Sequence, residues 1–327
     1  MKRKDFISSS LLTTAGLALP TLALAGMPNS LSNTSSYNLR KRSTGEKAKV
    51  CIFSKQLQWL NYHDLAKAVA DMGYDGIDLT VRANGHVLPE KVETDLPRAV
   101  EAAEKAGIKI LMVSTDIRDA DEPLTKRILK TAVAQKIQYY RTSGLNYQKN
   151  IDIPANLEII KKKFSGLAAL NKEYGLYSSY LNHSGEGFGS SIWDLWLTIK
   201  DLDPQYIGSQ YDIKHSTIAG AYSWPVCFKL IHPYVQTMVI RDFRWERNKD
   251  SWEIKPVPIG EGMVDFKKYF GLVKQYGITG PVCIMCDYDL GGAENGATSL
   301  TIPGKNVLVA MKKDLDAVKR HLQLEGI

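Results

Sequence analysis

Several charged and polar side chains of this chain stand where apolar, strand-like runs end. Near the middle, the segment YDIKHSTIAG (211–220) places Asp212 three residues before His215. A carboxylate and an imidazole at this spacing can bind a divalent metal or a substrate, and both groups can transfer protons. The same two residues can also cap a strand end, so the pair alone leaves both interpretations open.

Similar polar residues follow other strand-like runs along the chain. They are Lys55, Asp78, Arg82, Asp116, Arg141, Asn182, His183, Asp212, His215, Arg241, Asp242, Asp287 and Asp289. Each one alone has a structural explanation, because strand-end Asp and Asn cap the following helix and arginines pair with neighbouring acids. Their convergence on one end of one domain would favour a functional site for the set.

The elements that position these residues alternate regularly. Runs rich in β-branched and aromatic residues are separated by longer amphipathic stretches from Val50 onward. We expect strands at 49–55, 76–82, 108–116, 136–144, 176–185, 207–215, 235–243 and 282–289. This pattern predicts an α/β fold, a (β/α)8 TIM barrel formed by a single domain over residues 49–327. Such a barrel gathers its strand ends at one mouth, where its chemistry takes place.

The first 25 residues predict an export signal. They combine a basic start, the apolar run LLTTAGLALPTLALA and a small-residue cleavage site at Ala23-Leu24-Ala25. The start resembles the twin-arginine consensus with lysine in place of the second arginine. We therefore expect an exported, periplasmic protein with a polar, basic linker at 26–48. No other apolar run reaches the roughly 18 residues that span a membrane.

The formal net charge of +7 lies mostly outside the expected barrel. Loss of the signal leaves +5, and RKRSTGEKAK (40–49) carries five basic residues and one acid, so about +1 remains for residues 50–327. A nearly neutral body lacks the basic surface that nucleic acid requires. We expect a small-molecule partner and no nucleic acid.

The chain resembles the xylose isomerase-like TIM barrels, which include sugar phosphate isomerases and epimerases, and in particular the exported bacterial members of that family. The resemblance covers about residues 50–325. It rests on the motifs DMGYDGIDLTVR, LNHSG, YDIKH, VIRD and PIGEGMVDF in this order. It implies a carbohydrate substrate and a divalent metal, with zinc, manganese or iron suiting oxygen and imidazole ligands.

The resemblance also implies which strand ends hold the metal. Relatives carry Glu, Asp, His and Glu at the ends of strands five to eight, whereas this chain has Leu181, Asp212, Val239 and Asp287. Two of the four family positions thus lack a ligand, and the implied metal site is degenerate. The remaining candidate ligands are Asp212, His215, His183 and Asp287.

Loss of the carboxylate at Leu181 breaks the two-base arrangement that such epimerases use. A base must then come from His183 or Asp287, and an imidazole titrates near neutral pH. The expected substrate contacts are Asn182, Lys214, Arg241, Arg141 and Trp245. We expect an isomerase- or epimerase-like enzyme acting on an unphosphorylated sugar or keto-sugar derivative. A non-catalytic sugar-binding barrel, and a lyase or hydrolase of modified glycosides, remain open alternatives.

Overall fold

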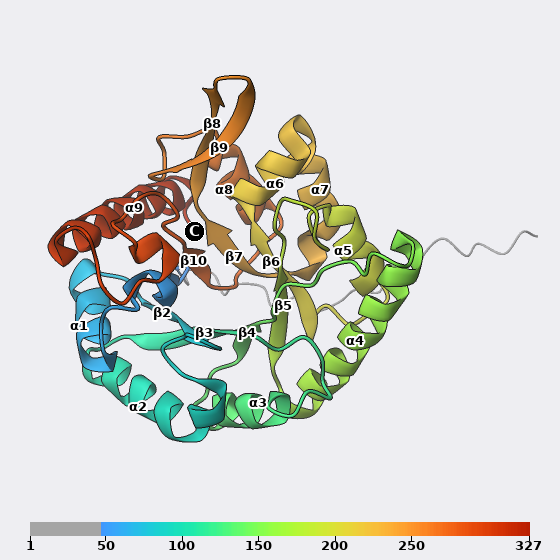
Figure 1. Cartoon of the computed structure of the whole chain (residues 1–327), viewed down its shortest axis with the longest axis horizontal. Coiled ribbons are helices and arrows are strands. Elements are labelled where there is room, and N and C mark those ends of the chain that lie inside the picture. Colours follow the sequence, from blue (N-terminus) through green and yellow to red (C-terminus); the bar gives the residue numbers. More distant parts are fainter. Residues whose placement is uncertain (1–46) are drawn as a thin grey trace, which may run out of the picture. The chain divides into compact units, whose positions relative to one another are not determined.

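The computed structural model describes residues 47–327, and eight short strands in this part run parallel to one another. They are β1 (Val50–Phe53), β2 (Gly76–Val81), β3 (Lys109–Thr115), β4 (Tyr139–Arg141), β5 (Tyr177–Leu181), β6 (Ile207–Asp212), β7 (Val235–Ile240) and β10 (Val282–Ile284). They close into a barrel in the neighbour order β1-β10-β7-β6-β5-β4-β3-β2 (Figure 1). The predicted (β/α)8 TIM barrel is confirmed.

Helices surround the strands on the outside of the barrel (Figure 1). In the described part they are α1 (Tyr62–Met72), α2 (Val92–Lys105), α3 (Thr125–Ala134), α4 (Ile153–Tyr174), α5 (Ile192–Ile199), α6 (Ile213–Gly220), α7 (Trp224–Ile231), α8 (Phe266–Gln275) and α9 (Gly304–Glu325). Short 3₁₀ turns lie at η1 (Ser54–Leu57), η2 (Pro89–Lys91), η3 (Ala221–Ser223), η4 (His232–Tyr234) and η5 (Ala293–Asn295). None of these helices is both long and apolar enough to cross a membrane.

Local sequence signals set the helix boundaries. The side chain of Asn61 accepts the backbone N–H of Asp64 at 3.0 Å, and Asp152 does the same for Ala155 at 2.8 Å, so these residues cap α1 and α4. Helix α1 ends at Gly73, whose φ of +87° is a left-handed conformation that favours glycine. These caps satisfy backbone groups that the helix ends would otherwise leave without partners.

One pair of strands was not predicted. β8 (Asp242–Asn248) and β9 (Ser251–Val257) form an antiparallel hairpin outside the barrel (Figure 1). The predicted strand 235–243 therefore ends at Ile240. The carboxylate of Asp242 accepts backbone N–H groups of Gly260 and Gly262, each at 3.0 Å, and so holds the segment that leaves the hairpin. A Cβ at Gly262 would lie 2.2 Å from Asp242 Oδ1, which is why a glycine stands there.

The predicted export signal at 1–25 lies outside the described residues, as do residues 26–46 of the predicted linker. Export and the linker therefore stay predictions.

Candidate functional site

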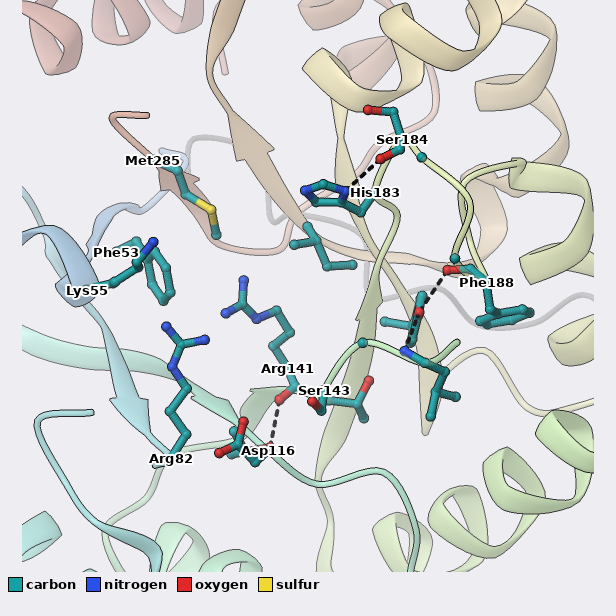
Figure 2. A pocket seen from close by; sticks show the side chains of 18 of the residues that line it. Phe53, Lys55, Arg82, Asp116, Arg141, Ser143, His183, Ser184, Phe188 and Met285 are labelled. Carbon is teal, nitrogen blue, oxygen red and sulfur yellow. Dashed lines mark hydrogen bonds between the residues drawn. The ribbon is translucent and has the colours of Figure 1, made fainter. Parts of the chain in front are cut away.

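A cavity of about 580 Å³ opens at the carboxyl ends of the barrel strands (Figure 2). Residues 183–188, in the loop after β5, supply one wall. Of the predicted site residues, the cavity lining includes Arg141, His183, Arg241 and Asp287. The chemistry-bearing side chains therefore converge on one mouth, as the alternating pattern predicted.

Arg241, directly after β7, joins two carboxylates from neighbouring strand ends. Its Nε donates to Oδ2 of Asp212 at 2.6 Å, and its Nη1 donates to Oδ2 of Asp287 at 2.5 Å. Lys214 adds a second cation, with Nζ 2.8 Å from Oδ2 of Asp287. Two positive and two negative groups thus form one nearly buried network whose formal charges cancel.

The pKa shifts of Arg241 and Asp287 indicate that these two residues are charged partners. Burial acts to lower the pKa of Arg241, but the carboxylates of Asp212 and Asp287 outweigh it and raise the pKa. Burial acts to raise the pKa of Asp287, but Arg241 and Lys214 lower it overall. Asp287 is therefore an ionised carboxylate held between two cations near neutral pH.

The pair Asp212 and His215 is brought to one side of the chain by a change of secondary structure. β6 ends at Asp212, and α6 begins at Ile213. Oδ1 of Asp212 accepts the backbone N–H of His215 at 3.0 Å, so Asp212 caps this helix. Of the two interpretations of the sequence pair, capping holds for Asp212, which is also a member of the charged network.

The residues present do not fit a divalent metal. Among residues 47–327, no group of three or more His, Cys, Asp and Glu side chains is arranged to hold an ion. Asp212 uses its two oxygens on His215 and Arg241, and Asp287 binds Arg241 and Lys214. A divalent ion here would face two neighbouring cations and compete with them for Oδ2 of Asp212 and Oδ2 of Asp287.

The two family positions that lack a ligand have an apolar role instead. Val239 lies in a small buried cluster with Cys51, Phe53, Cys283 and Met285, and Leu181 packs against it. These side chains gain stability from apolar burial. At the two positions where the sequence lacks a metal ligand, Leu181 and Val239 thus form apolar contacts next to the charged network.

We expect removal of divalent ions to leave the melting temperature of the protein unchanged, because Arg241 and Lys214 neutralise Asp212 and Asp287. Thermal unfolding followed by circular dichroism before and after dialysis against EDTA measures this. Separate additions of Mg²⁺, Mn²⁺ and Zn²⁺ complete the test. A melting temperature that falls on chelation and recovers with one of these ions would contradict the conclusion.

His183 is the imidazole at the cavity wall. Its Nδ1 lies 2.8 Å from the backbone oxygen of Ser184. A carbonyl oxygen only accepts, so Nδ1 carries the proton and Nε2 of the neutral ring has a free lone pair. Partial burial and the charge of Arg241 lower the pKa of His183, so the ring is neutral at physiological pH.

The imidazole of His215 packs against the imidazole of His183. The rings of His183 and His215 lie with centroids 3.7 Å apart. Nδ1 of His215 lies 2.8 Å from the hydroxyl oxygen of Ser184. Burial, followed by the charge of Arg241, lowers the pKa of His215 strongly. Both rings are therefore neutral, and their contact, with 38° between the ring planes, fixes the orientation of His183 in the cavity wall.

Other predicted site residues lie outside the cavity lining. Asn182 is buried, accepts the backbone N–H of Asp212 at 2.7 Å and donates to its carbonyl oxygen at 3.1 Å, which ties β5 to β6. Lys214 forms an ion pair with Asp287, which itself lines the cavity. Trp245 lies on the hairpin strand β8, where it packs edge-on against Phe243. These three residues do not form the cavity surface.

Two lining residues were visible in the sequence without being assigned a role. Lys55, in η1 after β1, and Arg82, directly after β2, point into the cavity together with Arg141 (Figure 2). Their position at strand ends was the only signal in the sequence, and it did not distinguish them from residues that form salt bridges.

A family model described as "Xylose isomerase-like TIM barrel" matches residues 66–301, which is well over half of the chain. The chain belongs to the xylose isomerase-like TIM barrel family. A comparison with curated proteins finds no match. The predicted family is confirmed, while membership of an exported branch stays a prediction.

Solved structures with the same fold include several sugar epimerases. An L-ribulose 3-epimerase is 13% identical, with a TM-score of 0.64, and the match covers 85% of this chain and 95% of that one. A 3-keto-D-glucoside 4-epimerase from E. coli is 11% identical, with a TM-score of 0.61 and coverage of 83% and 100%.

A xylose isomerase-like TIM barrel protein from Mycobacterium smegmatis, solved in complex with magnesium, is 15% identical. Its TM-score is 0.58, and the match covers 82% of this chain and 98% of that one. At these identities the similarity shows the fold alone, so the chemistry has to be argued from the residues of this chain.

Proposed function

We propose that this protein is an isomerase- or epimerase-like enzyme that removes and returns a proton on a carbon next to a carbonyl of a sugar derivative. The observation that carries the proposal is the orientation of His183. Its Nδ1–H is fixed on the Ser184 carbonyl oxygen, and Figure 2 shows the other ring nitrogen pointing into the cavity. A neutral imidazole in this orientation is a suitable general base near neutral pH.

Arg241 supplies the positive charge that such a step needs. A guanidinium has five N–H donors, and Arg241 uses Nε, Nη1 and Nη2 once each on Asp212 and Asp287. Two N–H donors remain on a group that lines the cavity. They can stabilise the negative charge that develops on the carbonyl oxygen when the neighbouring carbon loses its proton.

Asp287 has a different role from the one that its strand position suggested. Its pKa is lowered by Arg241 and Lys214, and a carboxylate of lowered pKa is a weak base. It is therefore better suited to hold Arg241 in place and to accept hydroxyl groups of the sugar. His183 is the preferred base.

We further propose an unphosphorylated carbohydrate as substrate and the periplasm as the place of action. The export signal predicted for residues 1–25 supports both proposals. Phosphorylated intermediates are kept in the cytoplasm, whereas an exported enzyme meets free sugars and their oxidised derivatives.

Two alternatives share the same cavity. A lyase would begin with the same proton removal and then expel a leaving group from the adjacent carbon, and one solved structure of this fold, 16% identical, is a probable 3-DHS dehydratase. A non-catalytic sugar-binding barrel is favoured by the apolar packing of Leu181 and Val239, where relatives carry ligands.

Proton exchange into D₂O tests the proposal and separates the alternatives. We expect the wild-type protein to replace one carbon-bound hydrogen of at least one member of a panel of neutral and acidic keto-sugars, followed by proton NMR. D-fructose should be epimerised slowly or not at all, because the two-base arrangement is missing at Leu181. Binding without exchange across the panel would indicate a sugar-binding barrel, and formation of an unsaturated product would indicate a lyase.

A further inference from the structure

Three cations form one wall of the cavity. Lys55 follows β1, Arg82 follows β2, and Arg141 ends β4, and all three side chains point into the same space (Figure 2). The guanidinium carbons of Arg82 and Arg141 lie 5.4 Å and 4.8 Å from the ring centroid of Phe53. One aromatic ring thus holds two guanidinium groups in place by cation–π contacts.

None of the three cations has a counterion within the part of the chain that the structure describes. Their side chains make no ion pair within 4.0 Å and no hydrogen bond with residues 47–327. Asp116, Glu186 and Asp287 also line the cavity, but none of them forms an ion pair with these cations. Asp287 attracts Lys55, yet its ion pairs are with Lys214 and Arg241. Asp78 attracts Arg141, yet its oxygens bind Ser114 at 2.7 Å and Cys283 at 3.5 Å.

This arrangement is unfavourable without a ligand. Arg141 is only 7% exposed, and a buried charge ordinarily has a partner of opposite charge. Burial lowers the pKa of Arg141, but an arginine in a protein keeps its proton. Burial and, next, the charge of Arg82 lower the pKa of Lys55. The repulsion within this wall disappears when an anion binds between the three groups.

We propose that Lys55, Arg82 and Arg141 bind an oxyanion group of the substrate, the carboxylate of an unphosphorylated sugar acid. The flat fork of arginine donors matches a carboxylate, and lysine adds a point charge. Figure 2 shows these cations across the cavity from His183. The inference rests on the proposed function for its reacting end: the substrate is a keto-sugar whose anionic group lies on this wall while its reacting carbon lies at His183.

Titration calorimetry with D-glucuronate, D-glucose 6-phosphate and neutral D-glucose tests the binding step alone. We expect an anionic sugar to bind at least tenfold more tightly than D-glucose, with an affinity that falls as salt rises. D-glucuronate should bind more tightly than D-glucose 6-phosphate, and the reverse order would contradict an unphosphorylated substrate. Equal affinity for neutral and anionic sugars, or no binding of either anion, would overturn the proposal.

Two substitutions sharpen the test. Arg82→Gln should weaken binding of the preferred anion at least tenfold. Arg141→Gln should do the same and also raise the melting temperature of the ligand-free protein, because it removes an unpaired buried charge. Arg118→Gln is the matched control, since Arg118 is an exposed arginine after β3 that does not line the cavity. An Arg141→Gln protein that is less stable yet binds the anion normally would contradict the inference.

Anion binding and proton exchange are separate measurements, so each can fail without the other. Tight anion binding without proton exchange on any keto-sugar would overturn the proposed chemistry and leave the anion site intact. Proton exchange on neutral keto-sugars, without preference for anionic ones, would confirm the chemistry and overturn the anion site.

Discussion

Replacing Arg241 by methionine is expected to destabilise the protein by about 3–5 kcal/mol, the effect of leaving a buried charge without its partner. Arg241 neutralises Asp212, which is fully buried, and Asp287. Methionine keeps much of the volume of the side chain but none of its charge. Asp287 then keeps its ion pair with Lys214, whereas Asp212 is left without a cation.

Urea unfolding of the wild type and of Arg241→Met measures the change. Arg244→Met is the matched control, because Arg244 pairs with Glu246 on the exposed hairpin and should change stability little. A second substitution, Asp212→Asn, should recover part of the loss in the Arg241→Met background, since it removes the charge that the first substitution leaves unpaired. An Arg241→Met protein as stable as the wild type would show that the network is not what neutralises Asp212.

Replacing His183 by asparagine is expected to slow proton exchange on the true substrate by about 10²–10⁴-fold, the usual contribution of a positioned general base. Asparagine can still donate to the Ser184 carbonyl oxygen, so the local structure is retained. The affinity for substrate should change far less than the exchange rate. His63→Asn, at an exposed histidine of α1, is the control.

The pH dependence checks the same assignment. The neutral form of His183 is the active one, and its pKa is lowered from the ordinary value of 6.5 by partial burial and by Arg241. The exchange rate should therefore still be undiminished at pH 6.5. It should fall only at more acidic pH, where the His183 ring becomes protonated. This acid limb should be absent from the residual rate of His183→Asn. Full activity in His183→Asn would instead transfer the role of base to another group.

The barrel could be predicted because its signals are local. Apolar runs and amphipathic stretches alternate within windows of a few residues, and each strand expected from the sequence is present in the barrel. The hairpin at Asp242–Val257 was missed because its strands face solvent. Residues such as Arg244, Glu246 and Lys255 interrupt any apolar run, so nothing in the sequence distinguished this segment from a loop.

The location of the site was also open to prediction. Carboxyl ends of parallel barrel strands lie at one mouth, so Arg141, His183, Arg241 and Asp287 had to be neighbours once the strands were assigned. What each side chain does was not predictable, because strand position does not give the direction of a side chain. Asn182 and His183 are adjacent in sequence, yet one ties two strands together and the other lines the cavity.

The sequence by itself determined the barrel, its single mouth and the types of charged groups around it. Only the tertiary structure decided how those charges pair, because ion pairs depend on ångström distances that barrel closure sets between residues far apart in sequence. Arg241 reaches Asp212 and Asp287 across 29 and 46 positions of the chain. Arg82 and Arg141 meet around Phe53 and line the same cavity as Lys55, with no ion-pair partner for the three among residues 47–327, and this makes them a wall that can receive an anion.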